Sequence, residues 1–157
     1  MARNLDLADK YLNSLSGKYY FKADNIARGQ ELIAMFARED DDGKINVHQM
    51  QTMWYEDYIG RAYLREGSYR PALKNFQYIS KHLDTILEDC QDFQNYPFRK
   101  GNYNHYQQLL KYEGTMYQGK WPVQGCINAM RTLSKIRKIC SDEEKKKEVQ
   151  EQHAEYM

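Results

Sequence analysis

The chain has 157 residues, of which 23 are basic and 22 acidic, so its formal net charge is +1 at pH 7. This near balance excludes binding to nucleic acid through bulk electrostatic attraction. The mean hydropathy is -0.91 and 14 residues are tyrosine, which favours amphipathic helices packed through aromatic rings. No apolar run approaches the ~20 residues that a membrane span needs. A soluble cytoplasmic helical protein is predicted, either one domain or one piece of a longer solenoid.

Two helices are predicted in the first part of the chain. Over residues 5–23, apolar side chains recur at steps of four, three and four residues, which places them on one helical face: Ala8, Leu12, Leu15 and Tyr19. An Asp-Asn pair ends this pattern, and a second helix is expected over residues 26–38 with Ile33 and Phe36 directed inward.

The acidic segment at residues 39–47 resembles a calcium-binding loop between two helices. Arg38 stands at the first ligand position, however, and Gln49 stands at the twelfth, where a bidentate glutamate is required. A cation at the leading ligand position defeats such a site. A solvated acidic linker is therefore expected, with no metal.

Residues 54–79 fit the helix–turn–helix unit of the tetratricopeptide repeat, whose period is about 34 residues. The small residues Gly60 and Ala72 stand where two helices must approach closely. The bulky residues Tyr63 and Phe76 fill the space between the helices, and Gly67 occupies the turn. Glu56 departs from the pattern, because a large residue is usual there. The first helix pair has equivalents of four of these positions, which predicts a second repeat: Gly17, Tyr20, Gly29 and Ile33.

Three further helices complete the expected architecture. The second helix of the 54–79 unit is expected to extend to about Glu88, and a polar connection over 89–97 follows, because Pro97 disfavours helical backbone at Tyr96. The next helix is predicted over residues 98–112. A last helix is predicted over 122–139, where apolar residues keep helical steps of three and four: Val123, Cys126, Ile127, Met130, Leu133 and Ile136.

These elements predict an all-α fold, a tetratricopeptide-like helical solenoid of about six antiparallel helices over residues 1–140. The segment 141–157 has almost no apolar content and mixes charges of both signs. It is expected to be a charged tail, either a frayed helix or disordered.

No catalytic or metal-binding constellation is recognisable in the sequence, since the four histidines are scattered and no phosphate loop or nucleophile motif is present. Binding residues are better indicated. Lys18 and Arg61 follow the equivalent glycines of the two repeats and would face an acidic or phosphorylated partner from the concave side. Lys10, Ser14, Lys18 and Lys22 form an i, i+4 ridge beside Tyr19, which suits a polyanion. The competing interpretation of this ridge is a solvated helix face.

Three stretches, in this order, resemble one protein family: LDLADKYLNSLSGKYYFKADNI, MQTMWYEDYIGRAYLREGSYRPALKNFQYISKHL and DFQNYPFRKGNYNHYQQLLKYEG. The family is that of the auxiliary, ribosome-associated scaffold subunit of the NatA N-terminal acetyltransferase. The resemblance implies a non-catalytic solenoid that binds the catalytic acetyltransferase subunit and helps to place it near the ribosome. It also implies a site for inositol hexakisphosphate at Lys10, Lys18 and Tyr19, whereas Arg61 gains no support from it.

The resemblance covers only a middle portion of the family's longer scaffold. The chain is therefore expected to be a fragment, a shortened paralogue or one chain of a larger assembly. The alternative function is that of a general tetratricopeptide adaptor, which binds a peptide or an acidic protein partner in its concave groove.

Overall fold

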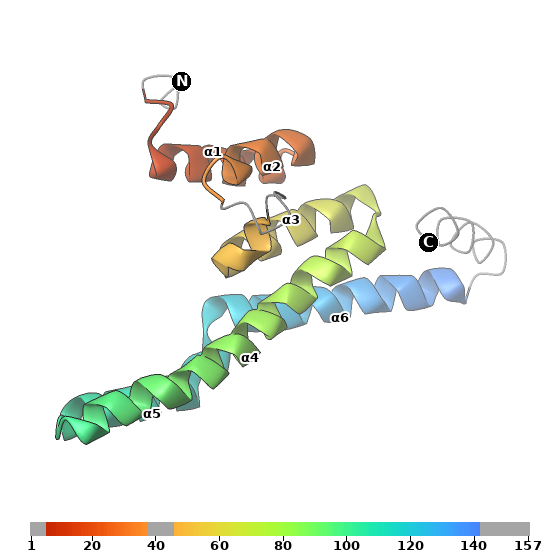
Figure 1. Ribbon diagram of the computed structural model, residues 1–157. Coiled ribbons are helices and arrows are strands. Elements are labelled where there is room, and N and C mark those ends of the chain that lie inside the picture. Colours follow the sequence, from red (N-terminus) through yellow and green to blue (C-terminus); the bar gives the residue numbers. More distant parts are fainter. Residues whose placement is uncertain (1–5, 38–45, 142–157) are drawn as a thin grey trace.

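The structure is a computed structural model that describes residues 6–37 and 46–141 (Figure 1). The calcium-like part of the linker and the charged tail lie outside the described residues. Within the described residues all regular secondary structure is helical, which confirms the predicted all-α class. The helices are α1 (Lys10–Lys22), α2 (Ile26–Ala34), η2 (Val47–Met50), α3 (Met53–Glu66), α4 (Tyr69–Arg99), α5 (Tyr103–Thr115), η3 (Met116–Gln118) and α6 (Lys120–Cys140).

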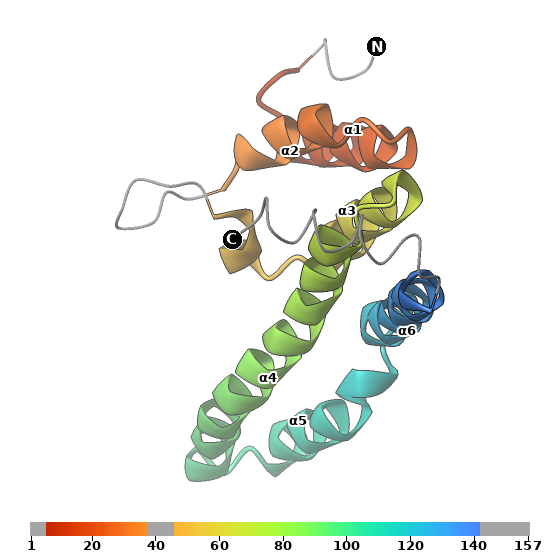
Figure 2. The same cartoon turned by 90° about the vertical axis from the view of Figure 1, so that its right-hand side faces the viewer.

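The helices pack as successive antiparallel pairs, α1 with α2 and α3 with α4, and α6 then packs against α4. α5 folds back along the far half of α4, so that these two helices extend away from the rest of the molecule (Figure 1). Figure 2 shows α1, α3 and α6 following one another along one side, which we call the inner side, with α2 and α4 on the other. This stacking of helix pairs is that of a solenoid. No described helix is long and apolar enough to cross a membrane.

Local capping explains where several helices begin. The side chain of Asp9 accepts a hydrogen bond from Leu12 N at 2.6 Å at the start of α1. Asn102 accepts one from His105 N at 3.2 Å at the start of α5. Such bonds satisfy backbone donors that a helix leaves free at its first turn. Gly67 ends α3 with φ 90°, a left-handed conformation in which glycine carries no steric penalty.

The two predicted repeats are confirmed by equivalent contacts. A Cβ atom placed on Gly60 would lie 2.6 Å from Cε1 of Phe76, and one placed on Gly17 would lie 2.9 Å from Cδ1 of Ile33. Both glycines therefore stand where the backbone of the first helix meets a bulky side chain of the second. Because a methyl group does not fit at either crossing, these two positions set how closely each pair packs.

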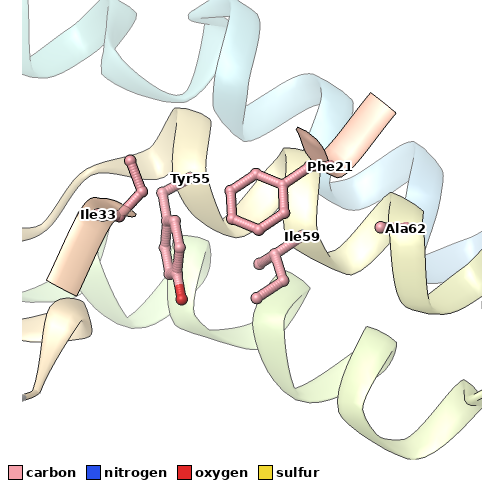
Figure 3. Close-up of a cluster of buried hydrophobic side chains, with 5 residues drawn as sticks. All are labelled: Phe21, Ile33, Tyr55, Ile59 and Ala62. Atoms are coloured by element: carbon pink, nitrogen blue, oxygen red, sulfur yellow. The ribbon is translucent and has the colours of Figure 1, made fainter. Parts of the chain in front are cut away.

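The core shared by the two repeats is partly aromatic (Figure 3). Phe21 from α1 meets Tyr55 from α3 edge to face, with ring centroids 5.6 Å apart and planes at 69°. Ile33 from α2 lies beside Tyr55, and Ile59 and Ala62 continue the cluster along α3 (Figure 3). Aromatic packing was expected from the tyrosine content, and it joins the first repeat to the second.

The predicted polar connection at residues 89–97 is wrong, because α4 continues without interruption to Arg99 and contains Pro97 in its last turn. Packing against α5 outweighs the local effect of the proline. Gln94 donates a side-chain hydrogen bond to Glu113 of α5. The Phe98 ring lies 5.5 Å from the ring of Tyr106. A proline at this position removes one backbone donor and crowds the carbonyl of the residue four positions earlier, yet α4 keeps its last turn where these contacts with α5 are made.

The apolar spacing of the first helix does not coincide with the face that the helix buries most deeply. α1 begins at Lys10, which leaves Ala8 outside it, and Tyr19 is 58% exposed. The face that α1 buries consists of Asn13, Gly17 and Phe21. The correct face follows from the close contact at Gly17 and the large ring one turn later, rather than from the spacing of the leucines.

The apolar spacing of α6 likewise does not mark its buried face. Three of its apolar residues are exposed: Val123 by 45%, Met130 by 62% and Leu133 by 51%. α6 buries Pro122, Gly125, Asn128 and Thr132 instead. A Cβ atom on Gly125 would lie 2.9 Å from Cδ1 of Ile79, so α6 lies against α4 through its small residues.

Candidate anion-binding surface

A groove of about 760 Å³ lies between α1, the end of α2, η2 and the start of α3. Lys10, Ser14 and Lys18 line it from α1, at the steps of four that the sequence predicted. Its other walls are largely apolar, with Ile33 and Trp54 among them, and the lining residues include no aspartate or glutamate in the described part of the chain. The groove therefore combines two lysines and a hydroxyl-bearing side chain with partly apolar walls.

Tyr19 does not line this groove, although the resemblance grouped it with Lys10 and Lys18. Its exposed ring lies 5.1 Å from the Nζ atom of Lys22, the last lysine of the ridge. The structure thus brings Lys10 and Lys18 together in one groove and places Tyr19 beside Lys22.

Lys18 and Arg61 converge on a single aromatic ring, that of Tyr58 on α3. The Nζ atom of Lys18 lies 5.1 Å from the ring centroid, and Cζ of Arg61 lies 5.4 Å from it. Lys22 approaches the same ring at 6.0 Å. The equivalence of Lys18 and Arg61 in the two repeats was visible in the sequence. Their common contact was not, because it joins side chains from two different helices.

This arrangement continues onto α6 through Trp121, which the sequence analysis did not single out. The rings of Tyr58 and Trp121 are 6.2 Å apart and tilted by 60°. The Nζ atom of Lys120 lies 4.6 Å from the Trp121 ring. Cation–π contacts of this kind are worth about 0.5–1 kcal/mol at exposed sites, so they orient the cations without neutralising them.

Asp57 lies buried beneath this surface and ties α3 to α6. Its Oδ2 atom is 3.1 Å from Nη1 of Arg61, and its Oδ1 atom accepts a hydrogen bond from Nδ2 of Asn128 at 2.7 Å. Burial raises the pKa of Asp57 above its ordinary value, and the opposing effects of Arg61, Asn128 and Lys120 offset this only in part. The carboxylate therefore holds Arg61 in place on the inner side.

A second buried carboxylate, Glu56, joins η2, α3 and α4. Its Oε1 atom lies 3.2 Å from Nδ1 of His48 and 3.0 Å from Nε2 of His82. Burial acts to raise the pKa of Glu56, but the hydrogen bonds with the two histidines outweigh it and the pKa is lowered. His48 also stacks on Tyr78 with ring centroids 3.8 Å apart.

The two histidines thus share the carboxylate of Glu56, which their spacing in the sequence did not reveal. The departure of Glu56 from the repeat pattern was the one feature of the sequence that pointed to a special role for this residue. Their geometry is that of a structural network. In the described part of the chain, no three ligating side chains are grouped so that they could hold a metal ion.

The stacked antiparallel helix pairs place the chain among the helical repeat proteins. Its sequence matches the model of the family "N-terminal acetyltransferase A, auxiliary subunit" over residues 1–156, and the chain belongs to this family. This confirms the resemblance found in the sequence.

Curated relatives agree with this assignment. The chain is 35% identical over 135 residues to the N-terminal acetyltransferase A complex auxiliary subunit NAA15 of Arabidopsis thaliana, covering 86% of this chain and 15% of that protein. It is 32% identical to N-alpha-acetyltransferase 16, NatA auxiliary subunit, of Mus musculus, covering 86% and 16% of the two chains. Both relatives are named as auxiliary subunits, in agreement with the expectation of at most a regulatory subunit.

The fold also matches a solved structure, "Structure of Naa15/Naa10 bound to HypK-THB", with a TM-score of 0.82 and 25% identity. The match covers 90% of this chain and 22% of that one. The chain therefore corresponds to a short portion of much longer scaffolds.

Proposed function

We propose that this chain is a scaffold segment that binds the catalytic acetyltransferase subunit of an N-terminal acetyltransferase, and that it holds inositol hexakisphosphate in the groove at Lys10 and Lys18. The observation that supports the first part is the likeness of the fold to a structure of Naa15/Naa10, with a TM-score of 0.82. In this role the chain supplies a rigid structure, and its helix pairs present their inner side to the partner. It would place the chain in the cytoplasm, on complexes that act at the ribosome.

Binding of the catalytic subunit is tested with the purified 157-residue chain and the catalytic subunit from the same organism. A stable complex is expected in size-exclusion chromatography, with saturable heat in calorimetry. Separate elution at micromolar concentrations of both proteins, together with the absence of heat, would contradict the scaffold role.

The ligand proposal depends on the geometry of the groove. Lys10 and Lys18 are two turns apart on α1, about 12 Å along its axis at 1.5 Å per residue, and Ser14 lies between them. Two ammonium groups at this spacing can contact phosphates on different sides of one inositol ring, while the hydroxyl of Ser14 donates to a third. The apolar walls lower the local dielectric constant, which strengthens these charged contacts.

Thermal unfolding with and without inositol hexakisphosphate tests this site. A ligand at 100 times its Kd stabilises the folded state by about 2.7 kcal/mol, which is expected to raise Tm by roughly 5–10 °C in a domain of this size. The double variant Lys10→Gln/Lys18→Gln should lose most of this increase. Its matched control is Lys74→Gln/Lys111→Gln, which removes the same charge from exposed positions on α4 and α5. Equal increases in both variants would rule out the groove.

A further inference from the structure

The inner side of the solenoid carries a continuous basic and aromatic surface outside the groove. We define this inner basic surface by Lys18, Lys22, Tyr58, Arg61, Lys120 and Trp121. Its residues come from α1, α3 and α6, which are neighbours along the inner side (Figure 2). Of the six residues, Lys18 alone also lines the groove.

The positive charge of this surface is largely unneutralised. Arg61 forms an ion pair with Asp57, whose side chain is fully buried. Within the described residues, no carboxylate forms an ion pair with Lys18, Lys22 or Lys120, which contact aromatic rings instead. Cations gathered around the two rings repel one another, and an anionic ligand would remove this repulsion.

The extent of the surface decides which shape of anion can use all of it. Packed helices lie about 8–10 Å apart, so a ligand that reaches from α1 across α3 to α6 spans roughly 16–20 Å. An extended peptide rises about 3.3 Å per residue and covers that distance with about five or six residues. The rings of Tyr58 and Trp121 lie between the cations and can pack against the aliphatic part of such a peptide.

We propose that the inner basic surface binds an extended acidic segment of a partner protein, with carboxylates on Lys22, Arg61 and Lys120 and apolar side-chain portions on the two rings. This rests on the proposed scaffold role and names the chemistry of a contact on the inner side. It is separate from the inositol phosphate groove, because three of its four cations lie outside that groove. Arg61 donates from Nη1 to buried Asp57 at 3.1 Å, and its side chain is still 40% exposed, so the fixed guanidinium remains accessible at this surface.

The test uses the full 157-residue chain and a fluorescein-labelled octapeptide of alternating aspartate and glutamate, followed by fluorescence anisotropy at low ionic strength. A peptide of alternating asparagine and glutamine is the uncharged control. The informative protein variant is Lys22→Gln/Lys120→Gln, because both lysines are exposed and the variant leaves the Asp57–Arg61 pair intact. Its control is again Lys74→Gln/Lys111→Gln, and circular dichroism melting establishes that both variants fold.

The acidic peptide is expected to bind the wild type and the control with similar affinity and to bind Lys22→Gln/Lys120→Gln about fivefold more weakly. Binding should also weaken at higher salt. Equal affinity for the two variants, or equal binding of the uncharged peptide, would overturn the proposal. One further result would overturn the proposal. In it, the variant Lys22→Gln/Lys120→Gln keeps its affinity for the acidic peptide but is no longer stabilised against heat by inositol hexakisphosphate. The melting experiment with Lys10→Gln/Lys18→Gln tests the inositol phosphate groove, and its outcome does not depend on the peptide result.

Discussion

Replacing Gly60 by alanine should destabilise the protein, although alanine is normally the better residue within a helix. Gly60 lies inside α3, where Ala is favoured over Gly by about 0.5–1 kcal/mol. The new methyl group would lie 2.6 Å from Cε1 and 2.9 Å from Cζ of Phe76. Phe76 is itself 3% exposed, so its ring has little room to move.

The size of the effect follows from these two opposed contributions. Overpacking a filled core costs about 1–3 kcal/mol. After subtraction of the helix-propensity gain, the net loss is roughly 0.5–2 kcal/mol, which lowers Tm by about 1–8 °C in a chain of this length. The same substitution at Gly114, in the last turn of α5, has no heavy atom within 4 Å of the new methyl group. There only the propensity gain remains, and Gly114→Ala should raise stability by up to about 1 kcal/mol.

Urea unfolding followed by circular dichroism measures both variants against the wild type. A further variant, Phe76→Leu, tests the cause, because a smaller side chain leaves room for the methyl group. The double variant Gly60→Ala/Phe76→Leu should be more stable than the sum of the single changes predicts, by at least about 0.5 kcal/mol. Stabilisation by Gly60→Ala, or strict additivity of the pair, would refute the assignment of Gly60 to a close helix crossing.

Other expected outcomes concern the buried polar groups of α3. Because the two histidines hold the pKa of Glu56 below its ordinary value despite burial, Glu56 contributes stability above its unfolded pKa and loses it as pH falls through the lower folded pKa. Glu56→Gln should therefore flatten the fall of the unfolding free energy between about pH 5 and pH 3, and an unchanged slope in urea titrations would contradict this. Burial raises the pKa of Tyr55 from 10.0 to about 12, so its contribution is present below about pH 10 and is lost as pH rises through about 12. Tyr55→Phe should lose less stability over that interval, by up to about 2–3 kcal/mol, and equal alkaline losses in both proteins would argue against a buried phenol. Asn128→Ala removes one partner of buried Asp57 and should cost about 1–3 kcal/mol, whereas Asp57→Ala/Asn128→Ala should cost less than the sum of the two single changes in guanidinium unfolding.

The register of the repeats could be predicted because it depends on residues that must be small. Gly60 opposite Phe76, and Gly17 opposite Ile33, are contacts within one helix pair, and their spacing is visible along the chain. In α1 and α6, by contrast, the apolar spacing does not mark the buried face. Apolar periodicity indicates which residues avoid water in an isolated helix. In α6 the contact with α4 is made by Gly125 and by polar Asn128 and Thr132.

In the candidate site, too, features within one helix could be predicted and contacts between helices could not. The i, i+4 ridge of lysines on α1 was evident, since it lies on one helix, and the structure places Lys10 and Lys18 in the groove. The meeting of Lys18 and Arg61 at Tyr58 joins two helices and could not be derived from spacing within either. Neither could the pairing of Glu56 with His82, which are 26 residues apart.

The sequence by itself determined the helices, the glycine-based crossings of the two pairs and membership of the auxiliary-subunit family, because these depend on local periodicity and on residues with few substitutes. The tertiary structure decided which faces are buried and which charged side chains meet. It also decided that α4 passes through Pro97, because α5 packs along its last turns. Each of these outcomes depends on contacts between distant segments. Such contacts outweigh local helix preferences, which are about 1 kcal/mol per residue or less. In the last turn of α4 they also outweigh the local penalty of a proline.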